Sequence, residues 1–569
     1  MESDLDIARS IELAPIEEIA WKMGIGVEEL IPFGRHMAKI TWPAIRSRLD
    51  RPRGSLVLVT SVNPTRYGEG KTVTTIGLSM GLNRIGKKAA CVIREPSMGP
   101  VFGIKGGAAG GGHVQVLPME DINLHFTGDL HAVTSAHNLC SAILDNQLHH
   151  GNGLKIDPSR LLWPRVIDMN DRTLRGAAIG LGGPGNGIAR EERFDITAAS
   201  EVMAILALST DYEDLRARLG NIVVGSAASD GRPIKAEDIG AAGTMALLMR
   251  TAFLPNLVQT TEGTAAFIHA GPFANIAHGN SSIIADRLAL SIHDIVVTEA
   301  GFGADLGAEK ALHIKTNASG LAPDCIVVNV TVRSMKMHGL GMAGLPSGKE
   351  ELKEENEEMV RHGASANLTK HIQNMAKFGP DVIVSINRFP TDSDAEIKAL
   401  MEIAKQAGAA DVALYEGHEK GGEGAEELAR AVSNAVQRHM ASGRPFNPLF
   451  KPNAPIMEKI ETIAKSMYGA TDISIKPRAK KQLDRIIEWG YGELPVCMAK
   501  TQYSFSHDPK LHGAPNGFTL PVREFRLNAG AGFVVAVCGD MMTMPGLPKK
   551  PAAEDMDMDK DGNLTGIFS

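Results

Sequence analysis

The sequence predicts an α/β protein with a mostly parallel sheet. Short runs rich in β-branched and apolar residues have the length and composition of buried strands; they occur at 55–62, 88–94, 294–300, 325–332, 381–387 and 411–416. Amphipathic stretches with helical periodicity lie between several of these runs, at 73–86, 395–408 and 425–440. This alternation favours right-handed βαβ units, because a helical crossover is what joins parallel neighbouring strands.

Length and composition narrow the class of protein. A chain of 569 residues is too long to fold around a single hydrophobic core, so two to four domains are expected. The net charge of -7 gives no global basic field that would attract nucleic acid. The chain has no run of about 18 apolar residues, as a membrane span requires, and its acidic N-terminus is unlike a signal peptide. The five cysteines are scattered without a CxxC pair, so we expect a soluble protein of the reducing cytoplasm.

The stretch that follows the first predicted strand has the context of a phosphate-binding loop. The strand at 55–62 leads into a short loop that ends in Gly70-Lys71-Thr72 and opens a predicted helix. In such loops, successive backbone N–H groups and the helix N-terminus surround anionic oxygens. Lys71 would reach the β- and γ-phosphates of a nucleotide, and Thr72 would ligate Mg²⁺. The alternative is a strand-to-helix turn that binds nothing.

The loop departs from the usual pattern in its first half. Thr65 stands where glycine is usual, and the bulky Arg66 and Tyr67 follow it. Gly68 and Gly70 remain, so the backbone can still approach a phosphate closely. We therefore expect the side chains of Arg66 and Tyr67 to project away from the nucleotide.

A second glycine-rich stretch, 94–116, follows the next predicted strand. Glycine makes up 60 of the 569 residues, about 10.5% against a usual ~7%. Lys105 lies within the tract and apolar runs flank it, which favours an anion-binding nest over a flexible linker. Arg94 ends the strand, where ligands of open α/β sheets gather. The histidines at 113, 125, 131 and 137 fit no common zinc spacing, so structural or substrate-facing roles are favoured.

Two further charged stretches receive structural interpretations. The run at 348–363 is predicted to be a solvated helix face near a domain boundary. Residues 555–566 resemble the opening of an EF-hand loop, but Phe568 stands where the bidentate glutamate is required. A hairpin around Asp561 and Gly562 is the better interpretation, and we expect no calcium site.

Several long motifs closely resemble those of formate–tetrahydrofolate ligases, also called formyltetrahydrofolate synthetases. The resemblance runs from about residue 55 to the end, and the motifs keep one order along the chain. They include "GIKGGAAGGG", "NLHFTGD", "RVIDMNDR", "FDITAASEVMAIL", "GPFANIAHG", "VVTEAGFGADLGAEK", "TVRSMKMHG", "INRFPTD", "KGGEG", "LPVCMAKTQYSFS" and "GAPNGFTLPVREFRLNAGAGF".

The resemblance implies a reaction and a set of site residues. Formate would attack the γ-phosphate of ATP to give formyl phosphate and ADP, and N10 of tetrahydrofolate would then attack the carbonyl, giving 10-formyltetrahydrofolate and phosphate. Lys71 would neutralise the transferring phosphate, Arg94 would hold formate or formyl phosphate, and Asp129 would lie near the folate amine. The implied nucleotide and folate contacts are Thr65, Arg66, Tyr67, Gly68, Glu69, Gly70, Lys71, Thr72, Phe302, Phe389, Leu414 and His418, with Thr72 also the Mg²⁺ ligand.

The resemblance also implies an architecture and an assembly. A large P-loop-containing ATP- and formate-binding domain would span 1–360, a second α/β domain contributing to the folate pocket would span 361–495, and a small C-terminal domain would span 496–569. A monovalent cation (K⁺ or NH₄⁺) would assist the enzyme, which would be a cytoplasmic homotetramer.

The sequence departs from the family pattern in three places. Arg66 and Tyr67 replace a Pro-Ala pair, and His113 replaces a tyrosine. His418 stands where the family has a tryptophan that sandwiches the pterin ring with Phe389. Such stacking contributes about 0.5–1.5 kcal/mol beyond burial, so its loss would weaken folate binding without excluding it.

Three interpretations of these departures stay open at this point. They are neutral drift in an ordinary ligase, the same formate activation with a different amine acceptor, or a non-catalytic nucleotide-binding protein that kept the fold. The retention of Lys71, Arg94 and Asp129 favours an enzyme, because a simple nucleotide binder has no need of a formate clamp.

Overall fold

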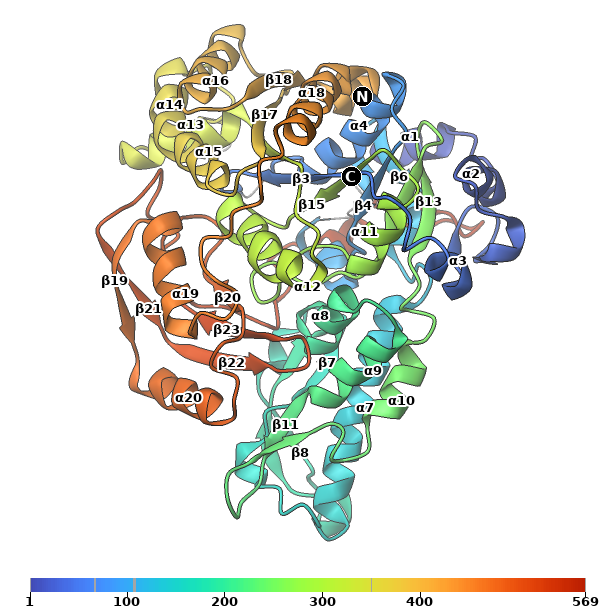
Figure 1. The fold of residues 1–569 in the computed structure, drawn as a ribbon, viewed down its shortest axis with the longest axis vertical. Helices are drawn as coiled ribbons and strands as arrows, with labels where there is room; N and C mark the ends of the chain where they lie inside the picture. The colour runs from blue at the N-terminus through green and yellow to red at the C-terminus, as the bar shows by residue number, and fades with distance from the viewer. Residues whose placement is uncertain (1, 66–67, 106–108, 349, 568–569) are drawn as a thin grey trace.

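A twelve-stranded sheet forms the centre of the fold (Figure 1). The computed structural model describes residues 2–65, 68–105, 109–348 and 350–567. From one edge to the other the strands are β1 (Leu30–Pro32), β2 (Ala38–Ile40), β13 (Asn256–Thr260), β14 (Ala265–Ile268), β4 (Ala89–Ile93), β15 (Ile295–Glu299), β3 (Ser55–Ser61), β16 (Cys325–Val330), β17 (Asp381–Asn387) and β18 (Asp411–Tyr415). Strands β5 (Gly110–Gly111) and β6 (Val114–Leu117) join beside β13.

The block from β14 to β18 is parallel, as the sequence predicts. All pairs from β14·β4 to β17·β18 run in the same direction. Side chains of β3 alternate between two cores: Val57 and Val59 lie on one side of the sheet, and Leu58 lies on the other. Both faces are covered, which explains why the six predicted strands are nearly continuous apolar runs.

Helices cover the two faces of this block. On one side, α4 (Lys71–Arg84) and α18 (Glu426–Ser442) pack on β3 and its neighbours. On the other side lie α13 (Val332–Met342), α14 (Glu357–Gly363), α15 (Thr369–Ala376) and α16 (Asp394–Gln406). The predicted helices at 73–86, 395–408 and 425–440 are therefore confirmed as α4, α16 and α18.

The antiparallel edge of the sheet was not among the predicted strands. Strand β13 pairs antiparallel with β2, β6 and β14. These strands have only two to five residues, and such short apolar runs cannot be distinguished from helix by periodicity. The fold is accordingly a mixed α/β protein with one large, mostly parallel sheet and several small sheets.

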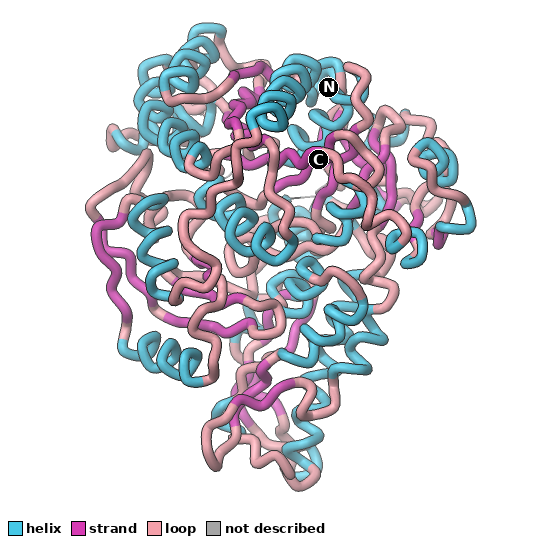
Figure 2. Tube along the Cα trace, viewed as in Figure 1, coloured by secondary structure: helices cyan, strands magenta, loops and turns pink. Residues whose placement is uncertain are grey.

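Two further groups of elements extend from the large sheet (Figures 1 and 2). The lower part of the view contains α7 (Asp129–His149), α8 (Glu201–Leu208), α9 (Tyr212–Asn221), α10 (Ala242–Met249) and the short strands β7 (Arg165–Ile167), β8 (Ala177–Ile179), β9 (Arg190–Glu192), β10 (Phe194–Ile196), β11 (Val223–Ser226) and β12 (Pro233–Lys235). The left side contains α19 (Ile456–Ile463), α20 (Pro477–Glu488), β19 (Ala470–Ile475), β20 (Val496–Ala499), β21 (Phe518–Val522), β22 (Glu524–Asn528) and β23 (Phe533–Val537).

The two charged stretches have the predicted character in part. Of the described residues in 348–363, those of α14 are helical and 350–353 form a turn. Near the C-terminus, β24 (Asp557–Met558) and β25 (Leu564–Thr565) pair antiparallel, so the hairpin around Asp561 is confirmed.

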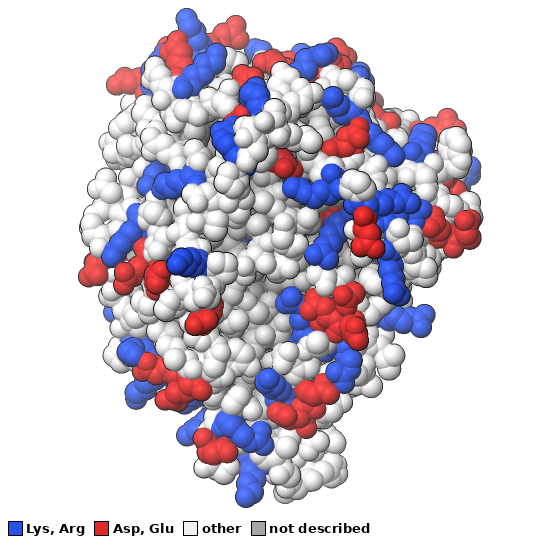
Figure 3. Space-filling view, in the orientation of Figure 1, with Lys and Arg blue, Asp and Glu red and all other residues white. Residues whose placement is uncertain are grey.

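Within the described residues, no helix combines the length and the apolar composition needed to cross a bilayer. Figure 3 shows Lys and Arg interspersed with Asp and Glu over the visible face, with no extended patch of one sign.

Candidate active site

The predicted phosphate loop joins the end of β3 to the start of α4. Gly70 precedes the helix with φ of 68°, and Gly68 has φ of 78°. Both values lie in the left-handed region that favours glycine. The first turn of an α-helix directs backbone N–H groups toward a bound anion, and α4 starts directly after this loop. Arg66 and Tyr67 fall outside the described residues, so the orientation of their side chains stays a prediction.

A hydrogen bond between Thr65 and Glu69 closes the phosphate loop on itself. Glu69 is buried, and one carboxylate oxygen accepts from the backbone N–H of Thr65 (2.6 Å) while the other accepts from Thr331 Oγ1 (2.6 Å). Burial raises the pKa of the Glu69 carboxyl. The carbonyl of Glu69 accepts from Asn329 Nδ2 (2.5 Å) and Asn387 Nδ2 (3.2 Å), at the ends of β16 and β17. The loop is thus anchored to neighbouring strands.

Lys71 and Phe302 are brought together by the fold. The ammonium Nζ of Lys71 donates to the carbonyl oxygen of Phe302 at 2.9 Å. Ser61 Oγ, at the end of β3, donates to the same oxygen at 3.1 Å. Phe302 has φ of 58°, an uncommon conformation for a bulky residue that marks functional segments. The backbone turn at Phe302 therefore sets where the Lys71 ammonium lies.

A carboxylate that sequence reasoning missed joins the phosphate loop to Arg94. Glu299 ends β15 and is buried. One of its oxygens accepts from Thr72 Oγ1 (2.8 Å), and the other accepts from Arg94 Nε (3.3 Å) and Nη2 (3.2 Å). Burial favours the neutral acid, but Arg94, Lys71 and Thr72 outweigh it and lower the pKa of Glu299 overall. Glu299 is therefore an ionised contact between the predicted magnesium ligand and the predicted formate clamp.

The signal that could have found Glu299 is its place at the end of a strand. Arg94 follows β4, and Glu299 closes the adjacent parallel strand β15. Carboxyl ends of parallel strands share one edge of a sheet, where ligands bind. These residues come together because of the order of strands in the sheet, and that order could not be predicted from the sequence.

Asp129 lies in a buried charged cluster. It is the first residue of α7 and accepts from Lys39 Nζ (2.8 Å) and Asn256 Nδ2 (2.8 Å). Glu95, next to Arg94, is also buried, and burial together with the charge of Asp129 raises the pKa of Glu95 well above its ordinary value. Asn256 Nδ2 also donates to the carbonyl of Ile268 (3.1 Å), which pairs with Ile93 at the end of β4, so Asp129 lies near that strand end. Sequence reasoning missed Lys39, Asn256 and Glu95.

Phe389 and Leu414 lie at the ends of β17 and β18. The Phe389 ring is half-buried, and the guanidinium carbon of Arg333 lies 4.7 Å from its centroid. The backbone N–H of Phe389 donates to Asp392 (2.8 Å), and burial raises the pKa of that carboxyl to about 6. Leu414 is partly buried against the core.

His418, the residue in place of the stacking tryptophan, is exposed on the short helix α17 (Gly417–Lys420). Its carbonyl oxygen accepts from the backbone N–H of His113 at 3.0 Å. Two departures from the family pattern, 305 residues apart in the sequence, therefore touch each other.

Oxygen donors for a magnesium ion are present at the phosphate loop. Thr72 Oγ1 and the Glu299 carboxylate lie 2.8 Å apart, and hydroxyl, carboxylate and phosphate oxygens are ligands that Mg²⁺ prefers. Across the described ranges, no group of three or more His, Cys, Asp or Glu side chains could hold a metal by itself. The donor set fits a magnesium ion that arrives with nucleotide phosphates.

Comparisons with known proteins identify the family of the chain. The family model described as formate–tetrahydrofolate ligase matches residues 2–568. Relatives named formate–tetrahydrofolate ligase include those of Paracoccus denitrificans strain Pd 1222 (54% identical over 568 residues) and Maricaulis maris strain MCS10 (55% identical over 568 residues), each covering 100% of both chains. That of Granulibacter bethesdensis is 52% identical and covers 100% of this chain and 97% of its own. The chain therefore belongs to the formate–tetrahydrofolate ligase family and is an ATP-dependent ligase.

Proposed function

We propose that this ligase joins formate to N10 of tetrahydrofolate through formyl phosphate, giving 10-formyltetrahydrofolate, ADP and phosphate. The observation that carries the proposal is the Glu299 carboxylate, which touches both the phosphate loop at Thr72 and the guanidinium of Arg94. Nucleotide and formate would thereby meet at one carboxylate, as a direct phosphoryl transfer requires.

In the first step, a formate oxygen attacks the γ-phosphorus of ATP and the bond to the β,γ-bridging oxygen breaks, releasing ADP. Lys71 would exchange its contact with the Phe302 carbonyl for the transferring phosphoryl oxygens. Arg94 offers planar N–H donors that match a carboxylate or a phosphate. A magnesium ion held by Thr72 would neutralise phosphate charge when bound.

In the second step, the amine N10 attacks the formyl carbon, and the bond from that carbon to the phosphate oxygen breaks. The amine proton passes to the departing phosphate oxygen, so the step releases inorganic phosphate as its monohydrogen form. Asp129 would orient the amine by accepting its hydrogen bond, while Lys39 and Asn256 hold the carboxylate in place. Phe302, Phe389, Leu414 and His418 would surround the folate.

Several finer features belong to the same proposal. The chain would use Mg²⁺ and a monovalent cation (K⁺ or NH₄⁺), assemble as a homotetramer and work in the cytoplasm, without nucleic acid or membrane partners. Units of 1–360, 361–495 and 496–569 remain the proposed domains. Strands β17 and β18 of the second unit continue the large sheet of the first.

A second candidate, the same formate activation with a different amine acceptor, is favoured by the contact between His113 and His418. The test is formate-dependent ADP release by the purified protein, with and without tetrahydrofolate. Release that rises with tetrahydrofolate and yields 10-formyltetrahydrofolate supports the ligase. Formate-dependent release that tetrahydrofolate does not change would refute folate as acceptor and support the second candidate.

A further inference from the structure

The motif at 494–506 resembles the family closely, yet the reaction described above gives it no role. Lys500 follows β20 and is fully buried. Its ammonium donates to Asp305 Oδ2 (2.5 Å), to the carbonyl of Ser504 (2.6 Å) and to the carbonyl of Thr501 (3.2 Å). All three N–H bonds of the ammonium thus have acceptors. The Tyr468 ring lies below it, with its centroid 4.8 Å from Nζ.

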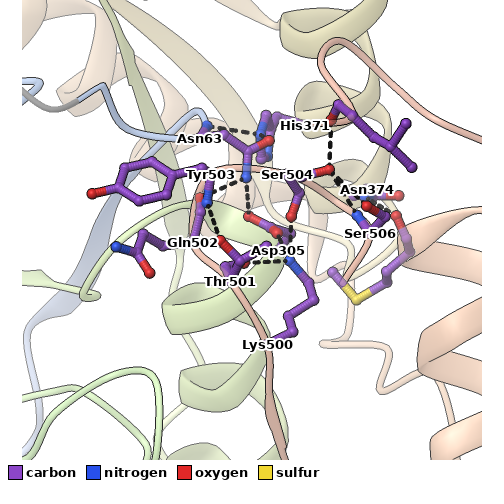
Figure 4. Close-up of polar contacts among 12 residues, drawn as sticks. Asn63, Asp305, His371, Asn374, Lys500, Thr501, Gln502, Tyr503, Ser504 and Ser506 are labelled. Atoms are coloured by element: carbon purple, nitrogen blue, oxygen red, sulfur yellow. Dashed lines mark hydrogen bonds and ion pairs between the residues drawn. The ribbon is translucent and has the colours of Figure 1, made fainter. Parts of the chain in front are cut away.

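Asp305 connects Lys500 to Asn63, which lies just before the phosphate loop (Figure 4). Its second oxygen accepts from Asn63 Nδ2 at 3.0 Å. The same amide group donates to the carbonyl of Gln502 at 3.1 Å. Asn63 is therefore held on one side by Asp305 and on the other by the C-terminal segment that Lys500 anchors.

Asn63 is also fixed from the helix side. Its backbone N–H donates to His371 Nε2 at 3.1 Å, and its Oδ1 accepts from Asn367 Nδ2 at 2.9 Å. Burial lowers the pKa of His371 to about 4, so the ring is neutral and Nε2 can accept. The other N–H of the Asn367 amide donates to the carbonyl of Gly513 at 2.8 Å, again in the C-terminal segment.

The two residues that this network holds lie next to the predicted phosphate loop and next to the Phe302 turn. Asn63 comes two residues before Thr65, where the phosphate loop starts. Asp305 comes three residues after Phe302, in the π-helical turn η7 (Ala304–Ala308) that follows the left-handed bend. The Phe302 carbonyl receives Lys71. A shift of Asp305 would therefore move the backbone that sets the position of the Lys71 ammonium.

We propose that Lys500, Asp305 and Asn63 form a positioning clamp, by which the C-terminal segment 500–513 holds the phosphate loop and the Phe302 turn in register for phosphoryl transfer. None of the three touches the reacting atoms; each acts through Lys71 and the loop. The inference rests on the proposed function in one respect, the role of Lys71 on the transferring phosphate.

The test replaces both charges of the clamp at once. Asp305→Leu with Lys500→Met substitutes apolar side chains of similar size, and such exchanges of a buried ion pair are often neutral or stabilising. We expect a melting temperature within a few degrees of wild type, but a kcat for formate-dependent ADP release that is about 10- to 100-fold lower, since small misplacements of reacting groups cost this much. The ADP dissociation constant should change much less than kcat, because Asn329 and Asn387 still anchor the loop at Glu69.

A matched control removes a comparable pair elsewhere. Lys315 and Asp286 form a buried ion pair at 2.6 Å between η8 (Ala311–Lys315) and α11 (Ile283–Leu290). Asp286→Asn with Lys315→Met should leave kcat near wild type. An equal loss of kcat in this control would overturn the proposal, because the removal of any buried ion pair would then lower kcat.

A second readout does not depend on activity. Amide hydrogen exchange of residues 300–306 should be faster in the clamp variant than in wild type, and unchanged in the control. If wild type shows no formate-dependent ADP release, the proposed function fails while this measurement still tests the clamp. A stable clamp variant with wild-type kcat or with unaltered exchange would overturn it. If that variant does not fold, Asn63→Ser replaces it, because this change leaves no buried charge without a partner. Its kcat and its amide exchange at 300–306 are then measured, and wild-type values of either would overturn the proposal.

Discussion

The charge of Glu299 should be needed for the use of formate far more than for the binding of nucleotide. Glu299→Gln keeps the size and one oxygen of the side chain but removes its charge. The Arg94 guanidinium then faces a neutral amide in place of the carboxylate that now accepts from both Nε and Nη2. Glu299 contacts the phosphate loop through the Thr72 hydroxyl, and the amide oxygen of glutamine can still accept from that hydroxyl, so we expect the loop backbone to keep its place.

The expected loss follows from the geometry. A hydrogen bond to a charged partner contributes about 1.5–3 kcal/mol. The two contacts from Arg94 share one oxygen at 3.2–3.3 Å, and the Arg94 side chain is 21% exposed, so solvent screens part of the interaction. We therefore expect a total loss of about 2–3 kcal/mol, which corresponds to roughly 30- to 140-fold in kcat/KM for formate at about 1.4 kcal/mol per tenfold.

The assay is steady-state ADP release at saturating ATP and tetrahydrofolate with varied formate, together with ADP binding by calorimetry. Glu237→Gln is the control, because Glu237 pairs with Arg216 on the surface with about half of each side chain exposed, and such pairs contribute ~0–1 kcal/mol. A Glu299→Gln enzyme within twofold of wild type for formate would refute the reasoning, as would an equal loss in ADP affinity.

Further substitutions test the other parts of the site and, at the buried Glu201 of α8, the stability of the fold. Lys71→Ala should abolish formate-dependent ATP turnover while the melting temperature stays near wild type; wild-type turnover would remove Lys71 from the mechanism. Arg94→Lys should keep ADP affinity and lose most activity, because an ammonium cannot make two parallel contacts; parallel losses of both would instead place Arg94 on the nucleotide. His418→Trp, combined with the family Pro-Ala pair at 66 and 67, should lower the KM for tetrahydrofolate if the departures weaken stacking, and an unchanged KM would mark them as neutral. Burial raises the pKa of Glu201 to about 7, so its ionisation destabilises the folded state as pH rises from about 4.5 to 7. Glu201→Gln should thus gain stability over wild type by up to about 3 kcal/mol at pH 8 but not at pH 4, and an equal shift in melting temperature at both pH values would contradict this.

The strand–loop–helix structure at residues 55–84 could be predicted because its signals are local. A continuous apolar strand, glycines at positions that need left-handed backbone, and Lys71-Thr72 at the start of a helix all fall within a short stretch. The parallel block could be predicted for a related reason. Strands buried on both faces must be apolar at every position, and that property is visible in each run by itself.

The contacts between distant segments could not be predicted in this way. Arg94 and Glu299 meet because β4 and β15 are neighbours, and no local pattern states the order of strands in a sheet. The Lys39–Asp129 pair depends in the same way on how α7 docks against β2. His113 and His418 were separate departures in the sequence, and only the fold makes them one feature.

The place of β3 in the sheet has a consequence for biosynthesis. Residues 55–61 pair with β15 at 295–299 and with β16 at 325–330, so the strand that leads into the phosphate loop waits for partners made about 240 residues later. At roughly 5–20 residues per second of translation, that wait lasts about 12–50 s. Throughout it an apolar, β-branched segment is present on the ribosome without its neighbours, and pairings of such large sequence separation form slowly. A ribosome stalled before residue 330 would therefore carry the complete phosphate-loop sequence and no nucleotide site, and that nascent segment is where a chaperone would be needed.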